Sequence, residues 1–190
     1  MILGENAEVR SGLVLARKQS KTKTENRYNL LNLRSINEDA TINKATLDVF
    51  DATEKLDSTY LTQPSDIIIR LSAPYTAVLI DQTTTGLLIS SNFAVIRADK
   101  TKIAPEYLYW YLNTEEIKKD IVKNSARNVI AAIRPQYYAQ LQLKDIPLEK
   151  QKKIGELNQL AKKELNLLQQ LQTEKAKYYE TKLNQLYETI

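Results

Sequence analysis

The chain has 190 residues, 43% of them hydrophobic and 26% charged, a composition typical of a globular protein with room for one domain and an appendage. It contains no His and no Cys, which excludes Cys nucleophiles, His general bases, disulfides and zinc sites built on either residue. The formal net charge of +4 permits an acidic partner without requiring one.

The first residues lack the basic segment and the apolar run of an export signal. The most apolar stretch, residues 67–80, is interrupted by Arg70, Ser72 and Pro74, so it does not have the pattern of a membrane-spanning helix. The absence of Cys agrees with a reducing compartment. We therefore expect a soluble, cytoplasmic protein.

Two short strand-like segments are expected near the N-terminus, at residues 8–16 and 28–36. The segment between them, residues 17–27, is polar and carries five cationic side chains against one Glu. Such a segment is either a solvated surface loop or a loop that contacts phosphates. The candidate phosphate contacts are Arg17, Lys18, Lys21, Lys23 and Arg27.

A β-rich region follows at residues 66–98. Its first part is rich in β-branched residues, and the Ser-Ala-Pro sequence at 72–74 predicts two strands that meet at a corner. Residues 86–98 repeat the pattern after a polar loop, so these strands together predict a compact sheet. Side chains on the turns beside the strands are candidates for DNA contacts that reach base edges in a groove. They are Arg70, Tyr75, Thr83, Thr84 and Thr85. Arg70 is alternatively a surface charge that flanks a strand.

The hydrophobic period changes to that of a helix after Pro105, a residue favoured at helix starts. The Tyr and Trp residues at 107–111 have helical spacing beside Leu, which favours core packing over stacking on bases. A second basic turn at 123–128 contains Arg127, a further candidate phosphate contact. Residues 135–146 lead out of this domain, and the alternation of Leu141 and Leu143 with polar neighbours predicts a short final strand there.

Pro147 ends that strand, and we place the domain boundary there, with one domain at 1–146 and a long helix at 147–190. A helix of about 42 residues is roughly 63 Å long at 1.5 Å per residue, too long for a small domain to cover. Its apolar residues recur at steps of three and four, with Gln172 in the only gap, and so define one face.

This apolar face predicts a coiled-coil interface with another helix. The repeat is imperfect, which favours a short or antiparallel pairing over a long parallel zipper. The predicted interface residues are Ile154, Leu157, Ala161, Leu165, Leu168, Ala176, Tyr179, Leu183, Leu186 and Ile190. A second, shorter stripe beside them contains Leu160, Leu167, Leu171 and Tyr178.

Five segments resemble, in this order, the specificity subunits of type I restriction–modification enzymes. They are LGENAEVRSGL (3–13), SDIIIRLSAP (65–74), GLLISSNFAVIRAD (86–99), IAPEYLYWYLNT (103–114) and LKDIPLEKQKKIGEL (143–157). The last resembles the family phrase that joins a recognition domain to a spacer helix. It keeps Ile146, Pro147, Glu149, Gln151 and Ile154, but it is shortened and has one of the two usual prolines.

The resemblance implies an α+β fold, in which a target recognition domain with a small twisted β-sheet and helices precedes the long helix. Such a domain reads one half of a bipartite site in double-stranded DNA. A full-length member of the family looks like two such units in tandem. The chain is therefore expected to be a half-subunit that forms a homodimer through its helices, or one half of a longer protein. The paired helices would set the distance between half-sites.

The sequence contains no Walker A run, no Gly-rich dinucleotide loop and no Asn-Pro-Pro-Tyr motif. The resemblance implies that methylation and cleavage belong to a methyltransferase subunit and a restriction subunit, and that S-adenosylmethionine, ATP and Mg²⁺ act only there. We expect this chain to be a non-catalytic DNA reader without a metal. The alternative is a coiled-coil scaffold or adaptor with a basic surface.

Overall fold

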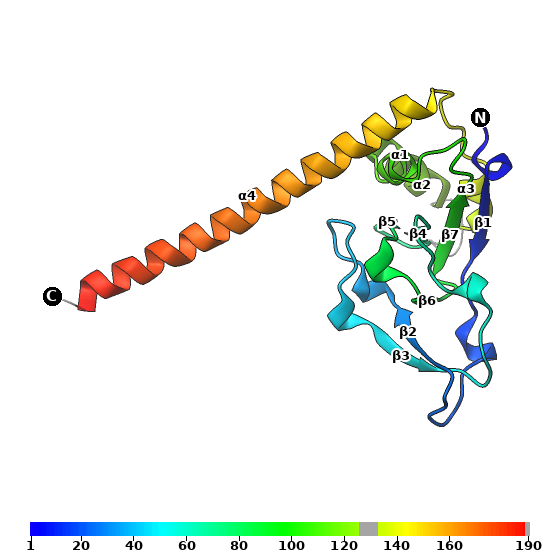
Figure 1. Cartoon of the computed structure of the whole chain (residues 1–190), viewed down its shortest axis with the longest axis horizontal. Coiled ribbons are helices and arrows are strands. Elements are labelled where there is room, and N and C mark those ends of the chain that lie inside the picture. The colour runs from blue at the N-terminus through cyan, green and yellow to red at the C-terminus, as the bar shows by residue number, and fades with distance from the viewer. Residues whose placement is uncertain (126–132, 189–190) are drawn as a thin grey trace. The chain divides into compact units, whose positions relative to one another are not determined.

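The computed structural model describes residues 1–125 and 133–188, which form the two compact units Met1–Gly155 and Glu156–Ile190. The first unit contains two β-sheets and helices α1 to α3 (Figure 1). A long helix, α4 (Leu148–Glu188), begins in the first unit and makes up the second. The predicted α+β fold with a long C-terminal helix is confirmed.

The larger sheet has four antiparallel strands in the order β1-β7-β4-β5 (Figure 1). Their bounds are Ala7–Ser11 for β1, Phe93–Ala98 for β7, Ile67–Arg70 for β4 and Ala77–Leu79 for β5. The predicted pair of strands that meet at a corner is confirmed as β4 and β5, which are joined through the cis peptide Ala73–Pro74.

The two central strands are buried on both faces. Ile67 and Ile69 point into one hydrophobic cluster, called the first core below, whereas Ile68 between them points into another. The reason is that successive side chains of a strand face opposite sides. All three are fully buried. A strand covered on both faces must be apolar throughout, which explains why the sequence shows a continuous apolar run here instead of an alternation.

A second sheet contains β3 (Asp48–Asp51), β2 (Arg27–Leu31) and β6 (Leu88–Ile89), in that order. The prediction that the segments after residue 66 form a single sheet is therefore wrong. β6 pairs in parallel with β2, while β7 pairs with β1 and β4. The chain turns between β6 and β7, where the Phe93 amide donates to the Ser90 carbonyl at 3.1 Å.

The two predicted N-terminal strands are shorter than expected. β1 ends before Gly12, where a Cβ atom would overlap the backbone at Ile89 and Ser90. β2 ends at Leu31 because Asn32 starts a 3-10 turn, and its side chain accepts a hydrogen bond from the Ser35 amide at 3.0 Å. The close backbone contact at Gly12 thus ends β1, and the cap formed by Asn32 ends β2. Both strands stop before the apolar pattern of the sequence does.

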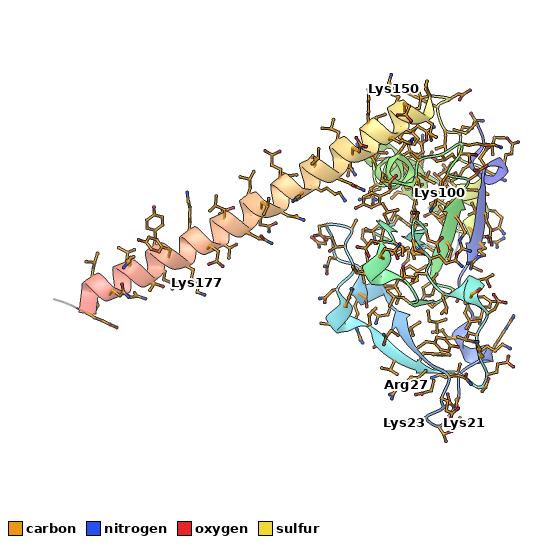
Figure 2. All side chains as sticks on the ribbon, viewed as in Figure 1. Lys21, Lys23, Arg27, Lys100, Lys150 and Lys177 are labelled. Atoms are coloured by element: carbon orange, nitrogen blue, oxygen red, sulfur yellow. The ribbon has the colours of Figure 1, made fainter. Side chains whose placement is uncertain are left out.

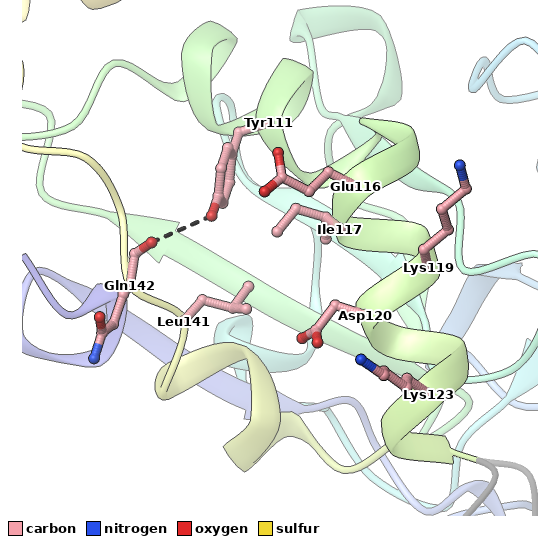
Figure 3. A pocket seen from close by; sticks show the side chains of 8 residues that line it. All are labelled: Tyr111, Glu116, Ile117, Lys119, Asp120, Lys123, Leu141 and Gln142. Atoms are coloured by element: carbon pink, nitrogen blue, oxygen red, sulfur yellow. Dashed lines mark hydrogen bonds between the residues drawn. The ribbon is translucent and has the colours of Figure 1, made fainter.

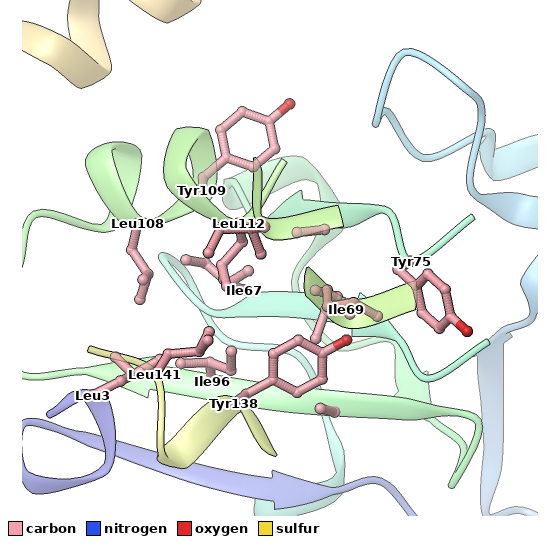
Figure 4. Close-up of a cluster of buried hydrophobic side chains, with 14 of the residues drawn as sticks. Leu3, Ile67, Ile69, Tyr75, Ile96, Leu108, Tyr109, Leu112, Tyr138 and Leu141 are labelled. Atoms are coloured by element: carbon pink, nitrogen blue, oxygen red, sulfur yellow. The ribbon is translucent and has the colours of Figure 1, made fainter. Parts of the chain in front are cut away.

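Three helices cover one face of the larger sheet. They are α1 (Pro105–Leu112), α2 (Glu115–Ser125) and α3 (Pro135–Ala139). The predicted helix after Pro105 is confirmed, with a break where Asn113 hydrogen-bonds both backbone groups of Ala77 in β5. Figure 4 shows Leu108 and Leu112 with Ile67 and Ile96 in the first core.

The aromatic segment 107–111 belongs to the same core, as predicted: Tyr107 and Tyr109 are buried, and Trp110 and Tyr111 pack against the cluster. The predicted strand at 135–146 is wrong. The stretch with Leu141 and Leu143 follows α3 and makes only an isolated bridge from Gln142 to Ile2. Residues 123–125, predicted as part of a turn, continue α2.

The first two turns of α4 are attached to the first unit. Gln151 is 1% exposed. Its Nε2 donates to the Lys102 and Ile146 carbonyls at 3.0 and 3.1 Å, and its Oε1 accepts from the Ala104 amide at 3.0 Å. A Cβ at Gly155 would overlap Glu106, so only glycine permits this approach.

Candidate nucleic-acid interface

The basic loop between Arg17 and Arg27 is held at its base by the smaller sheet. The Ser20 amide donates to the Asp51 carbonyl at 2.8 Å, and the Thr24 hydroxyl donates to the Ala52 carbonyl at 2.9 Å. Figure 2 shows Lys21, Lys23 and Arg27 together at one end of the first unit. The loop therefore has an anchored base and a cationic tip.

Two of its five cations are paired with carboxylates. Lys18 forms an ion pair with Glu54, and the Arg27 Nε lies 3.8 Å from Asp51 Oδ1. The hydrogen bond from Lys18 lowers the pKa of the Glu54 carboxyl. Such exposed pairs contribute little to stability.

The other three cations have no carboxylate within 4 Å among the residues the structure describes, and all three are exposed. They are Arg17, Lys21 and Lys23. These cations carry the uncompensated positive charge of the loop.

The threonine run has a local structural role. Asp81 is the N-cap of a 3-10 turn, Gln82–Thr84. The Thr83 and Thr84 hydroxyls donate to its carboxylate at 2.9 and 2.8 Å, and the Thr85 hydroxyl donates to its carbonyl at 2.9 Å. Burial pushes the pKa of Asp81 upward, but the hydrogen bonds from Thr84 and Thr83 outweigh this effect and lower it. Thr83 and Thr85 are exposed, and Thr84 is buried.

Arg70 and Tyr75 lie at the two ends of the β4–β5 corner. Tyr75 is 4% exposed and packs in the first core (Figure 4). Arg70 is half-buried at the end of β4 and lines a pocket of about 450 Å³. The sequence gives no local sign of this pocket, because its walls come from segments that are far apart in the chain.

Arg127 and Ile190, both predicted as contact residues, lie outside the described residues. Ile154 packs against the first core together with Ile146. The remaining residues of the predicted helix interface are exposed. Its five leucines expose between 54% and 69% of their surface: Leu157, Leu165, Leu168, Leu183 and Leu186. The apolar face of α4 is thus exposed at these leucines.

A second hollow of about 530 Å³ lies beside α2 (Figure 3). Glu116, Asp120, Lys119 and Lys123 line it, so it has charges of both signs. Two of its lining residues are hydrogen-bonded to each other: the Tyr111 hydroxyl donates to the Gln142 carbonyl at 3.2 Å. Equal numbers of carboxylates and ammonium groups give this hollow no net attraction for an anion.

Among residues 1–125 and 133–188, no cluster of carboxylates has the arrangement needed to hold a metal ion. None of the described helices combines the length and the apolar character that a membrane span requires.

Comparison with known proteins gives matches in structure alone: no family model and no curated protein matches the sequence. The chain is similar to the HsdS subunit from Thermoanaerobacter tengcongensis, with a TM-score of 0.65 and 16% identity over 92% of this chain and 44% of that chain. A second similar structure concerns complex assembly and conformational transition of the type I R-M system. Its TM-score is 0.57 and its identity 15%, over 89% of this chain and 45% of that one.

The chain thus has an HsdS-like fold along nearly its whole length, and it spans less than half the length of either similar chain.

Proposed function

We propose that this chain is a DNA-reading specificity subunit of a type I restriction–modification system, and that it reads one half of a bipartite target. The observation that carries the proposal is the fold, since 92% of the chain matches part of an HsdS subunit. The coverage of that subunit, 44%, supports a unit with one recognition domain and one spacer helix.

The basic loop would provide the first contact with DNA. Cationic side chains hold phosphates in a sequence-independent way, and other polar groups then reach the base edges. Arg17, Lys21 and Lys23 suit the first task because they are exposed and lack carboxylate partners among the described residues. The chain would be non-catalytic, and partner methyltransferase and restriction subunits would supply the chemistry with S-adenosylmethionine, ATP and Mg²⁺.

The exposed face of α4 would pair with the same face of a second copy. A helix of 41 residues is roughly 60 Å long, which is more than the roughly 34 Å of one DNA turn. A homodimer of this kind would place two recognition domains on two half-sites. Its target would be palindromic, because two identical domains related by a two-fold axis read the same sequence on opposite strands.

Duplex DNA binding at several salt concentrations tests the proposal. The logarithm of affinity should fall linearly with the logarithm of salt concentration. Substitution of Lys21→Gln together with Lys23→Gln should reduce this slope by about two for each copy of the chain in the complex, since each phosphate contact contributes about 0.9. The matched control is Lys100→Gln with Lys102→Gln, because both side chains are exposed and Lys100 lies far from the loop in Figure 2.

An equal loss in both double variants would exclude a specific role for the loop. The competing function is a coiled-coil scaffold or adaptor, which the exposed apolar helix face also suits. A wild-type chain that self-associates but does not bind duplex DNA at low salt would favour the scaffold. Co-purification with a methyltransferase subunit, followed by mapping of methylated sites, would test the complete assignment.

A further inference from the structure

The pocket beside Arg70 lies where the turn after β2 meets the β4–β5 corner. Leu33 and Ile36 come from the turn, Arg70 from the end of β4, and Pro74 and Thr76 from the corner. Its volume is about 450 Å³. Three segments thus enclose a partly apolar hollow with a guanidinium group in its lining.

This guanidinium is poorly satisfied by the protein. One of its Nη atoms donates to the Leu33 carbonyl at 3.5 Å, the outer limit of a hydrogen bond. Its Nε is buried and has no hydrogen-bond partner among the described residues, and no carboxylate of those residues lies within 4 Å. Burial lowers the pKa of Arg70, although a guanidinium remains charged at neutral pH.

Two other arginines differ from Arg70 because their guanidinium groups are paired with carboxylates of this chain. Arg97 on β7 makes two hydrogen bonds of 2.8 Å to Asp66, which raise its pKa. Arg34, which also lines the pocket, is paired with Asp48. Arg70 has no such partner among the described residues, and its side chain is half-buried, so its Nη donors, unlike the buried Nε, remain available for an acceptor from outside.

The shape of the site decides between the two kinds of DNA acceptor. Base edges lie recessed within a groove, and a residue that reads them must project into it. Phosphates form the outer surface of the duplex and can enter a concave site. A guanidinium also matches two phosphate oxygens with two parallel N–H donors.

We propose that this pocket seats one backbone phosphate of duplex DNA and that Arg70 donates hydrogen bonds to its oxygens. The inference rests on the proposed function and deepens it, since it assigns Arg70 to phosphate contact instead of base reading. Glu38 also lines the pocket. Its carboxylate repels anions, so a phosphodiester with one negative charge fits better than inorganic phosphate with two.

The test is the salt dependence of duplex binding by the full chain with Arg70→Gln. Loss of one phosphate contact in each bound copy should reduce the slope of log affinity against log salt by about 0.9 per copy, equally on duplexes of unrelated sequence. Arg70→Lys should keep most of the slope because it keeps the charge. The thermal midpoint of Arg70→Gln should be equal to or above that of the wild type, because a desolvated charge without a counterion is removed.

The matched control is Lys100→Gln, which removes one exposed positive charge away from the pocket. Its slope should equal that of the wild type, and a reduction equal to that of Arg70→Gln would overturn the inference by showing a net-charge effect. An unchanged slope in Arg70→Gln, or a loss confined to some sequences, would also overturn it. If the wild-type chain does not bind duplex DNA at all, the proposed function fails; if it binds and only the Arg70 result is negative, the pocket assignment alone fails.

Discussion

Gln151 joins three parts of the backbone with one buried amide. Ala104 is the residue before α1, and no side chain of its own segment caps that helix. The Gln151 Oε1 accepts from the Ala104 amide, while its Nε2 satisfies two carbonyls. A buried polar group that loses its partner costs more than its hydrogen bond contributed. Removal of this amide therefore leaves several backbone groups unsatisfied.

We expect Gln151→Ala to reduce the free energy of unfolding by about 2 to 4 kcal/mol, because it both opens a cavity and leaves buried groups without partners. Gln159→Ala is the control, since Gln159 is exposed on the same helix and should change stability by less than about 0.5 kcal/mol. Urea unfolding measures both. Equal stabilities for the two variants would show that the three hydrogen bonds of Gln151 do not stabilise the fold.

The sequence marked Gln151 only as part of a phrase that resembles the start of a spacer helix. Its partners Lys102 and Ala104 lie 49 and 47 residues away, and no local pattern connects them. The same limit applies to the basic loop. Its exposed cations were predictable from charge alone, but the pairing of Lys18 with Glu54 depends on how the loop meets a distant segment.

Among the elements, α4 and α1 were the most predictable, because a helix forms from neighbours in sequence and its period persists over several turns. The strands were found, but their sheet membership was not. β6 has two residues, too few for any alternation to show which sheet it joins. Leu141 and Leu143 alternate with polar residues as in a strand. Both side chains are nevertheless buried in the core just after α3.

The exposed face of α4 leads to a prediction about association. We expect Leu168→Lys with Leu183→Lys to weaken self-association by at least about a hundredfold, since each buried Leu contributes roughly 2 kcal/mol. Asn166→Lys with Asn184→Lys adds the same charge on the opposite face of the helix and should leave association unchanged.

Light scattering over a range of concentrations distinguishes these variants. A wild-type chain that is monomeric throughout would contradict the homodimer, although a different chain could still supply the second helix. Truncation is a less clean test at the predicted boundary, because removal of everything after Asp145 also removes Gln151 and Ile154 from the first unit.

At the scale of the whole molecule, the buried tyrosine hydroxyls determine how the free energy of unfolding changes at alkaline pH. Burial, with the nearby Asp39 as a smaller cause, raises the pKa of Tyr109 to about 12, and burial also raises the pKa of Tyr107 and Tyr138. Phenols in the unfolded chain titrate near pH 10. Stability from these groups is therefore fully present below about pH 10 and is lost as the pH rises from there toward about 12.

We expect the free energy of unfolding to fall over this window by an amount on the order of 2 kcal/mol for Tyr109 alone. Urea midpoints between pH 8 and pH 12 measure the fall, and Tyr109→Phe should flatten it. A wild-type curve that stays level through this range would show that the phenols ionise equally well in the folded chain. Between pH 6 and 8 little change is expected, because the chain contains no His.

The overall fold class followed from the predicted strands and helices together with the family resemblance, but the arrangement of the two sheets did not. It depends on contacts such as the crossing at Gly12 and the pairing of β2 with β6, which join segments far apart in the chain. The candidate site likewise has one part that the sequence predicts and one part that it does not. The loop is a continuous segment and could be predicted as such, whereas the Arg70 pocket exists only after three segments have met.

Strand β2 connects the two proposed phosphate contacts. The basic loop ends where β2 begins at Arg27, and the turn that carries Leu33 follows where β2 ends. Five residues of strand span about 16 Å, which separates the end of the basic loop from the start of that turn. Pairing with β3 on one edge and β6 on the other fixes this length. On these assignments the smaller sheet holds the base of the basic loop and the turn that lines the Arg70 pocket on one rigid strand, so a change of the loop tip should alter the first phosphate contact without moving the second.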